Sequence, residues 1–253
     1  MRVFLTGATS GIGEALARHY AGMGATLGLV ARRRHELERV AAALPTTTVA
    51  IYPADVRDGQ AMAAAAADFC ARFGAPDIVI ANAGVSRGTL TEIPGDLAAF
   101  RTVFDTNVMG MVNTFSPFAA MLRRERRGTL VGIASVAGFR GLPGAGAYTA
   151  SKAAAITYLE SLRIEFHGSG VAVVTLCPGF VATPLTAQNP YPMPFILPPE
   201  RAAQLMAKAI ARQARFHVLP WQVAWFWRFL RLLPRPLFDR ALAGRQRKPR
   251  HGD

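Results

Sequence analysis

RVFLTGATSGIGEALARHYAGM, residues 2–23, is the stretch that decides the fold of this chain. The run RVFLT is short and apolar, as a buried strand is, and after the glycines apolar residues recur at helical steps. Glycines let a backbone turn tightly against a pyrophosphate, and a helix N-terminus offers that anion unpaired N–H groups. The order of strand, glycine turn and helix therefore predicts a dinucleotide site, to which we assign Gly7, Gly11, Ile12 and Gly13.

The alternation of strands and helices continues along the chain. The apolar runs TLGLVA, DIVIA, TLVGIA and VAVVTL are typical of parallel strands that are buried on both sides. Alternation at this rhythm predicts right-handed βαβ units with helices on both faces of one sheet. We therefore expect a single α/β domain over residues 1–219, a Rossmann-type doubly wound parallel sheet of about seven strands. The expected strands are 2–6, 25–31, 48–52, 77–81, 128–134, 170–176 and 215–219, and the expected helices are 11–23, 34–44, 57–73, 96–124, 146–168 and 199–213.

A second pattern concerns Tyr148 and Lys152, which lie four residues apart, and Ser135, thirteen residues before the tyrosine. Residues i and i+4 share a helix face, so the phenol and the ammonium can point at one spot. A free phenol has a pKa of about 10, and a neighbouring cation lowers that pKa and makes the phenol usable as an acid and base. Alone, the pair also fits a surface tyrosine beside a solvated lysine, so its meaning depends on the glycine turn.

The glycine turn has the spacing G-x-x-x-G-x-G, and further short motifs follow it in order. Together they resemble the motifs of the short-chain dehydrogenase/reductase family over residues 1–219. The resemblance implies hydride transfer between a nicotinamide cofactor and a carbonyl or alcohol, with Tyr148 as the proton donor and acceptor. The motifs that carry it are TGATSGIG (6–13), Asn82-Ala83-Gly84, Asn107, Ser135, Tyr148-x-x-x-Lys152 and Pro178-Gly179.

The choice between the two nicotinamide cofactors depends on the residue after the second strand. An acidic side chain there accepts hydrogen bonds from the ribose 2′-hydroxyl of NAD and would repel a 2′-phosphate. This chain has Arg32 and Arg33 instead, and arginine binds phosphate through paired, charge-assisted hydrogen bonds. We therefore expect a preference for NADP(H) over NAD(H), with Ser10 adding a hydroxyl. The alternative is that these arginines only begin a solvated helix.

The resemblance also implies roles for the remaining motif residues. Lys152 would contact the nicotinamide ribose, Ser135 would hold the substrate oxygen, and Asn107 would order a water that links Lys152 to solvent. Asn107 could instead be a helix-interior amide that is paired to the backbone. For other positions the resemblance implies contacts with other parts of the cofactor. Asp55 and Val56 would contact the adenine, and Asn82, Ala83 and Gly84 the adenosine ribose. Pro178, Gly179 and Val181 would lie on the carboxamide side, and Thr183 would contact the phosphates.

Composition limits the class of protein. Half of the 253 residues are apolar, and the two cysteines, Cys70 and Cys177, have no metal-ligand spacing, so we expect buried free thiols, a reducing compartment and no metal. The first expected strand begins at Arg2, which leaves no room for a signal peptide, and no apolar run has the length of a membrane span. We expect a cytoplasmic protein that does not bind nucleic acid, and the resemblance implies a homodimer or homotetramer.

Two segments near the C-terminus concern the substrate and the partners. Residues 184–199, PLTAQNPYPMPFILPP, are apolar and rich in proline, and with Phe139, Leu142 and Pro143 they predict a lid over a lipophilic substrate. Residues 220–253 form a basic extension whose first part, 220–243, is amphipathic and contains all three tryptophans. Such a segment lies either on the inner face of a membrane or against protein. The end, RQRKPRH, is expected to be solvated.

Three functions fit these patterns. The first is an NADP(H)-dependent oxidoreductase of a lipophilic alcohol or carbonyl. The second is a 3-oxoacyl carrier-protein reductase, because an acidic partner protein would suit the basic extension. The third is a cofactor-bound scaffold that has lost catalysis, although Asn107, Ser135, Tyr148 and Lys152 are all present.

Overall fold

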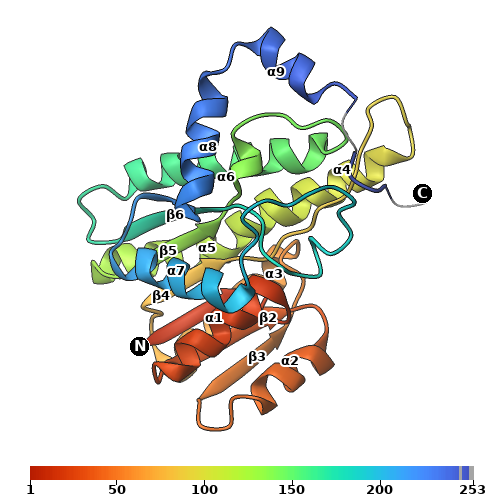
Figure 1. Ribbon diagram of the computed structural model, residues 1–253. Coiled ribbons are helices and arrows are strands. Elements are labelled where there is room, and N and C mark those ends of the chain that lie inside the picture. The colour runs from red at the N-terminus through yellow and green to blue at the C-terminus, as the bar shows by residue number, and fades with distance from the viewer. Residues whose placement is uncertain (245–246, 251–253) are drawn as a thin grey trace.

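The computed structural model describes residues 1–244 and 247–250. Its centre is a parallel sheet with the strand order β3-β2-β1-β4-β5-β6-β7 (Figure 1). The order reverses between β1 and β4, where Val3 pairs with Ile78. In such sheets ligands bind outside the carboxyl ends of the strands at this reversal. The strands are β1 (Arg2–Thr6), β2 (Thr26–Ala31), β3 (Val49–Pro53), β4 (Ile78–Ala81), β5 (Thr129–Ile133), β6 (Ala172–Pro178) and β7 (Phe216–Leu219).

Helices cover both faces of the sheet, so the doubly wound α/β fold is confirmed. On one face α1 (Gly11–Gly22), α2 (Arg34–Ala42) and α7 (Pro199–Ala211) bury one apolar cluster. On the other face a second cluster packs under α3 (Gly59–Phe73), α5 (Gly110–Glu125) and α6 (Gly146–Glu165). Phe4 of β1 lies in this second cluster, with its ring centroid 4.9 Å from that of Phe118. The predicted strands all form, with ends that differ by at most two residues.

The predicted helix over 96–124 forms as one continuous helical segment, but it contains a π-helical turn that the sequence did not predict. The chain forms α4 (Asp96–Phe104), a π-helical turn η1 (Asp105–Met109) and then α5. At the end of this turn Gly110 packs closely against Val56, since a Cβ on Gly110 would lie 2.6 Å from a methyl carbon of Val56. Single π turns inside helices are frequent at functional sites, and this one carries Asn107.

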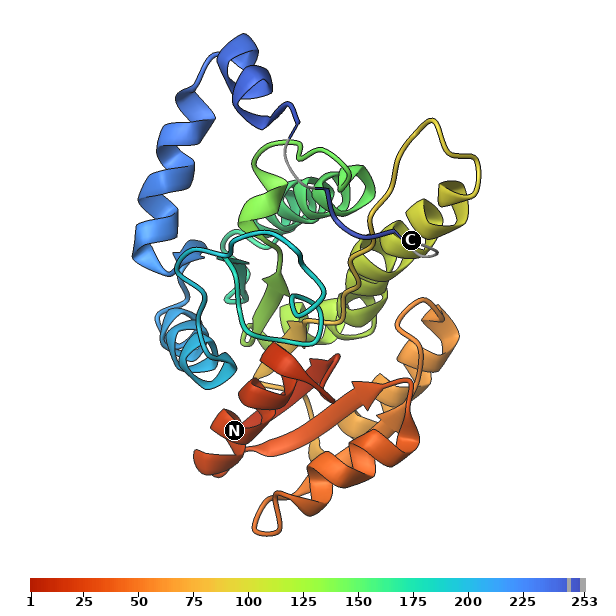
Figure 2. The same ribbon diagram turned by 45° about the vertical axis from the view of Figure 1, so that its right-hand side comes forward.

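The C-terminal extension packs on the domain and also leaves apolar side chains exposed. It forms α8 (Trp221–Leu232) and α9 (Arg235–Leu242), drawn in blue in Figure 2, and α8 contacts β7, the edge strand of the sheet. Val223 is buried, and the guanidinium of Arg140 lies 4.1 Å from the ring centroid of the buried Phe238. Outside these contacts Trp221, Trp225 and Leu232 are largely exposed. No helix in the described ranges is both long and apolar enough to cross a membrane.

The prediction of a solvated end is wrong for Lys248 and Arg250. Lys248 is only partly exposed and donates a hydrogen bond to Ser86. Arg250 forms an ion pair with Asp96 at the start of α4, and Figures 1 and 2 both show the C-terminal residues beside this helix. The cysteines are free thiols, as predicted, although only Cys177 is fully buried. Residues 245–246 and 251–253 of the predicted basic end lie outside the described residues.

Candidate active site

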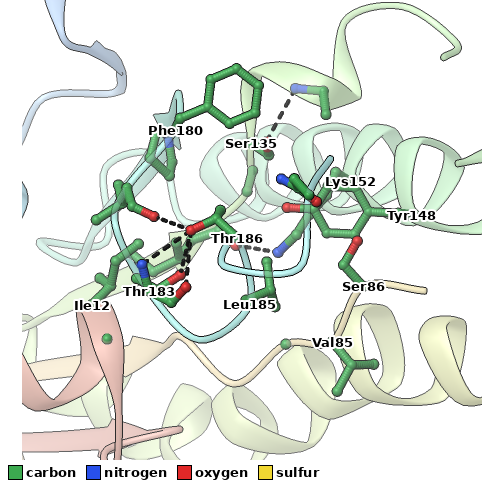
Figure 3. Close-up of a pocket in the computed structure, with 18 of the residues that line it drawn as sticks. Ile12, Val85, Ser86, Ser135, Tyr148, Lys152, Phe180, Thr183, Leu185 and Thr186 are labelled. Atoms are coloured by element: carbon green, nitrogen blue, oxygen red, sulfur yellow. Dashed lines mark hydrogen bonds between the residues drawn. The ribbon is translucent and has the colours of Figure 1, made fainter. Parts of the chain in front are cut away.

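A cavity of about 1080 Å³ lies along the carboxyl ends of the strands. It is lined by the glycine turn after β1 and by the segments that follow β2, β3, β4, β5 and β6, and Figure 3 shows its centre. With one exception, every residue predicted for the site lines this cavity. The exception is Asn107. The predicted residues that line the cavity are Gly7, Ser10, Gly11, Ile12, Gly13, Arg32, Arg33, Asp55, Val56, Asn82, Ala83, Gly84, Ser135, Tyr148, Lys152, Pro178, Gly179, Val181 and Thr183.

Side chains would not fit at the three glycine positions of the turn. Gly7 and Gly11 have φ angles of +68° and +53°, in the left-handed region that favours glycine. A Cβ on Gly13 would collide with the carbonyl oxygen of Gly7, and a Cβ on Gly11 would lie 2.7 Å from the Thr183 side chain. The Asn82 amide donates hydrogen bonds of 3.1 Å to the carbonyls of Thr6 and Gly7, which fixes the turn against β4. The N-terminus of α1 is therefore accessible to an anion, and a dinucleotide pyrophosphate fits this turn.

At the far end of the cavity Arg32 and Arg33 follow β2. Both side chains are exposed, and neither makes an ion pair with any described residue. Asp55 lies on the same wall, where the Arg57 guanidinium bonds to it at 2.7 Å and holds the pKa of this carboxyl below its usual value. Two cations near the end of β2 are therefore available for an anionic ligand.

Tyr148, Ser135 and Lys152 meet near the middle of the cavity. Burial raises the pKa of Tyr148, and only the nearby Ser135 hydroxyl acts to lower it, so the expected lowering by Lys152 is not seen. The Lys152 ammonium lies 5.9 Å from the centroid of the Tyr148 ring and donates a 2.8 Å hydrogen bond to the carbonyl of Ile133. Burial lowers the pKa of Lys152 to about 8. A phenol, a hydroxyl and an ammonium therefore lie together at one place in an apolar cavity (Figure 3).

Asn107 lies behind the cavity wall and is fully paired. Its Oδ1 accepts a 2.8 Å hydrogen bond from the amide of Val85, and its Nδ2 donates to the carbonyl of Val85 and to the hydroxyl of Ser151. The side chain therefore joins the segment after β4 to helix α6. A water between Asn107 and Lys152 stays a prediction.

The segment after β6 is stabilised by a threonine that the sequence motifs do not include. Thr186 donates a 2.6 Å hydrogen bond to the carbonyl of Val181 and accepts one of 3.1 Å from the amide of Thr183 (Figure 3). Of the expected lid, Tyr191 and Phe195 line the cavity, whereas Leu197 packs against the core.

Sequence reasoning missed other lining residues, and four of them carry polar or aromatic side chains that bear on the substrate. Ser86 lies after the Asn-Ala-Gly motif, and Phe226, Phe238 and Lys248 come from the C-terminal extension. The concentration of aromatic residues in the extension is a signal for Phe226 and Phe238. No local pattern marks Lys248, because its contact with Ser86 joins residues that are 162 positions apart.

Comparison with known proteins agrees with this geometry. The family model described as short chain dehydrogenase matches residues 1–192. An uncharacterized oxidoreductase of Myxococcus xanthus is 40% identical over 94% of each chain, and an 11-beta-hydroxysteroid dehydrogenase A of Sesamum indicum is 36% identical over 73% of this chain and 53% of its own length. A short chain dehydrogenase/reductase of Burkholderia phymatum in complex with NAD superposes with a TM-score of 0.81 at 27% identity, over 90% of this chain and 91% of its own. The dinucleotide cradle and the Tyr–Ser–Lys group thus belong to an oxidoreductase that binds a nicotinamide cofactor, and the chain is a member of the short-chain dehydrogenase/reductase family.

Proposed function

We propose that this oxidoreductase uses NADP(H) to interconvert a lipophilic carbonyl compound and the corresponding secondary alcohol. The observation that carries the proposal is the meeting of Tyr148, Ser135 and Lys152 in one cavity with the glycine turn. When bound, the nicotinamide supplies the hydride for reduction and accepts it in oxidation. The rest of the chemistry is proton transfer and orientation by the chain.

Tyr148 is the proposed acid and base. Its raised pKa keeps the phenol protonated at neutral pH, so it can donate its proton to a carbonyl oxygen during reduction. Ser135 lines the same cavity and would hold the same substrate oxygen. In oxidation Tyr148 must lose its proton, and the Lys152 cation would favour the phenolate.

The cofactor preference rests on Arg32 and Arg33. Both are exposed at the end of β2 without a carboxylate partner among the described residues, and the position lacks the acid that binds a free 2′-hydroxyl. A 2′-phosphate would provide the missing anion. The similar structure from Burkholderia phymatum binds NAD, so the preference is a property of these arginines and not of the fold.

A lipophilic substrate is supported by the walls of the cavity beyond Tyr148. Leu142, Tyr191 and Phe195 line this end, together with Phe226 and Phe238 from the extension. A similar protein is named as a hydroxysteroid dehydrogenase, which acts on a large apolar molecule, although this chain matches only about half of its length. The carrier-protein alternative is weaker, because Lys248 lines the cavity and Arg250 is ion-paired with Asp96, so neither is presented on the outer surface to an acidic partner protein.

The decisive experiment follows NADPH absorbance with a series of aryl and alicyclic ketones. Tyr148→Phe removes only the hydroxyl that carries the proton, so it is expected to lower kcat by a factor of about 10² or more while cofactor binding remains. Turnover that persists near the wild-type rate in this variant would refute the proposed role. If no ketone or alcohol is converted with either cofactor, the scaffold alternative gains support.

We also propose that the enzyme is cytoplasmic and associates peripherally with a membrane. The exposed side chains of Trp221, Trp225 and Leu232 lie on an extension that is rich in arginine, a combination suited to the inner face of an anionic membrane. A second copy of the chain is the other partner that would cover these side chains, in a dimer or tetramer.

A further inference from the structure

The C-terminal residues 247–250, here called the strap, are fixed to the domain at several points. Arg250 forms ion-pair contacts of 2.9 and 3.1 Å with the two carboxylate oxygens of Asp96. Pro249 accepts a 3.1 Å hydrogen bond from the amide of Gly88. At the other end Arg247 packs closely on Gly144, because a Cβ atom added to Gly144 would lie 2.7 Å from the Cβ atom of Arg247.

These contacts place the strap on the two loops that border the substrate end of the cavity. One loop follows β4 and carries Ser86 and Gly88, and the other follows β5 and carries Gly144. The loops are already joined, because the amide of Thr89 donates a 3.0 Å hydrogen bond to the carbonyl of Gly144. The strap therefore rests on a connected rim, and this fixes the position of the residue in its middle, Lys248.

Lys248 directs its ammonium at the catalytic group. Its Nζ lies 2.7 Å from the hydroxyl of Ser86 and 5.6 Å from the ring centroid of Tyr148, and the side chain lines the cavity. Ser86 and Tyr148 lie next to each other on the cavity wall (Figure 3). The cation is thus within a few bond lengths of the place where a carbonyl oxygen would meet the phenol.

Among residues 1–244 and 247–250, no carboxylate compensates the charge of Lys248. An ammonium has three donors, and within the described residues Lys248 has one hydrogen-bond acceptor, the neutral hydroxyl of Ser86. No carboxylate of the described residues lies within ion-pair distance. Burial lowers the pKa of Lys248 to about 8, as is typical of a cation placed among apolar groups. An unpaired, partly buried cation is costly, and an anionic ligand would offset that cost.

We propose that Lys248 forms an anion-recognition site for the substrate, so that the preferred substrates are apolar ketones or alcohols that carry a carboxylate a few bonds from the reacting carbon. The inference rests on the proposed function for the position of the carbonyl at Tyr148. Phe226 and Phe238 line the same cavity as Lys248 and give it apolar wall, which suits a keto acid with an aryl or alkyl body. Ser86 would hold the ammonium in place.

The test compares 4-oxo-4-phenylbutanoate with its methyl ester, because the pair differs in charge and shares the ketone and the ring. The wild-type enzyme is expected to show a higher kcat/KM for the acid. Lys248→Met should lower the acid-to-ester ratio by about tenfold or more, mainly through KM, since a charge-assisted hydrogen bond is lost. Lys248→Arg should restore part of the ratio. Lys208→Met, which removes an exposed cation on α7, is the matched control and should leave the ratio unchanged.

A second measurement separates this inference from the proposed function. With saturating NADP⁺, which prevents reduction, the acid should raise the Tm of the wild type more than the ester does, and Lys248→Met should abolish the difference. If no ketone is turned over but this difference is seen, the proposed reaction fails and the anion site stands. Equal Tm shifts by the acid and the ester overturn the anion site. Where the ketones are turned over, equal kcat/KM values for acid and ester, or an unchanged ratio in Lys248→Met, also overturn it.

The strap itself is tested with Arg250→Met, which removes the ion pair with Asp96 and leaves Lys248 in the chain. If the strap positions the ammonium, this variant also loses part of the preference for the acid. Retention of the full preference in Arg250→Met would show that the Asp96 contact is not needed to position Lys248, and would overturn that part of the inference.

Discussion

The Nζ atom of Lys152 lies 2.8 Å from the carbonyl oxygen of Ile133, so helix α6 is tied to the last residue of β5 by a buried ammonium. Ser135 follows that strand end after one residue, and it lines the same cavity as Tyr148 on helix α6. One strand end and one helix face therefore fix all three groups of the proposed reaction. Because Lys152 is buried, its pKa is lowered to about 8, so its charge depends on pH in the range where the enzyme would be assayed.

This leads to a prediction for the pH dependence of ketone reduction. Burial lowers the pKa of Lys152 to about 8, so the ammonium is charged below this pH and neutral above it. If catalysis needs the charge, kcat/KM should fall by up to about tenfold per pH unit above pH 8, while Tyr148, whose pKa is raised, remains protonated. Lys152→Arg keeps the charge and should move the decline to higher pH in an assay with a neutral ketone. A decline at the same pH in this variant would assign the titration to another group.

The second prediction concerns the cofactor. Arg32→Asp places a carboxylate at the end of β2, where it would accept hydrogen bonds from a 2′-hydroxyl and repel a 2′-phosphate. The ratio of kcat/KM for NADPH to that for NADH should fall by about 10² or more, since a charge-assisted phosphate contact is replaced by a repulsion. Arg34→Asp is the control, because Arg34 lies next in sequence but does not line the cavity. An unchanged ratio in Arg32→Asp would contradict the assignment to NADP(H).

The parts of the site that could be predicted are those encoded locally. The glycine turn follows β1 within a few residues, and its glycines are required by the contacts of Gly7, Gly11 and Gly13 themselves. Strand ends could be located because a run of apolar residues stops there, which placed Arg32, Asn82 and Ser135 on one edge of the sheet. Parallel strands then bring these separate motifs together without further information.

The parts that could not be predicted depend on contacts that are distant in sequence. The π turn at Asp105–Met109 leaves the apolar periodicity of 96–124 almost intact, so the pattern indicates one helix. The run RQRKPRH looks solvated because charge alone does not reveal a partner, and the partner of Arg250 is Asp96, 154 positions away. The apolar residues around Trp225 recur at helical spacing, and this spacing is the same whether the helix face contacts lipid or protein. Periodicity therefore could not decide between the two.

A third prediction concerns stability in acid. Arg39 bonds to Glu14 at 2.9 Å and to the carbonyl of Thr9 at 3.0 Å, so it links α2 to the glycine turn. The bond to Arg39 is the main reason that the pKa of Glu14 is lowered in the fold. A carboxyl with a lowered folded pKa stabilises the fold above its unfolded pKa, and the contribution disappears as the pH falls through the folded pKa.

Arg39→Met should therefore lower the free energy of unfolding at pH 7 by about 1 kcal/mol, a small value because Arg39 is half exposed. The difference from wild type should shrink as the pH falls below about 4.5, the usual pKa of the carboxyl. Arg34→Met provides the comparison, since its pair with Glu38 is long, at 3.9 Å, and solvent-exposed. Urea titrations of both variants between pH 3 and 7 measure this. A difference for Arg39→Met that stays constant with pH would show that Glu14 is not its important partner.

The last prediction concerns the exposed face of α8. Trp221 and Trp225 are each 69% exposed and lie one helical turn apart, so they form one apolar surface that the domain does not cover. Tryptophan is well suited to the boundary between lipid headgroups and acyl chains, and the arginines of the extension add attraction to anionic lipid. The full chain should therefore float with vesicles that contain phosphatidylserine, and the double variant Trp221→Ser/Trp225→Ser should remain in the dense fraction. Phe100→Ser, which alters an exposed aromatic residue on α4, should float like the wild type.

If neither the wild type nor the variants float, and light scattering shows that the double variant has lost a dimer or tetramer, then the face is covered by a second copy of the chain. In that case the proposal of membrane contact is wrong.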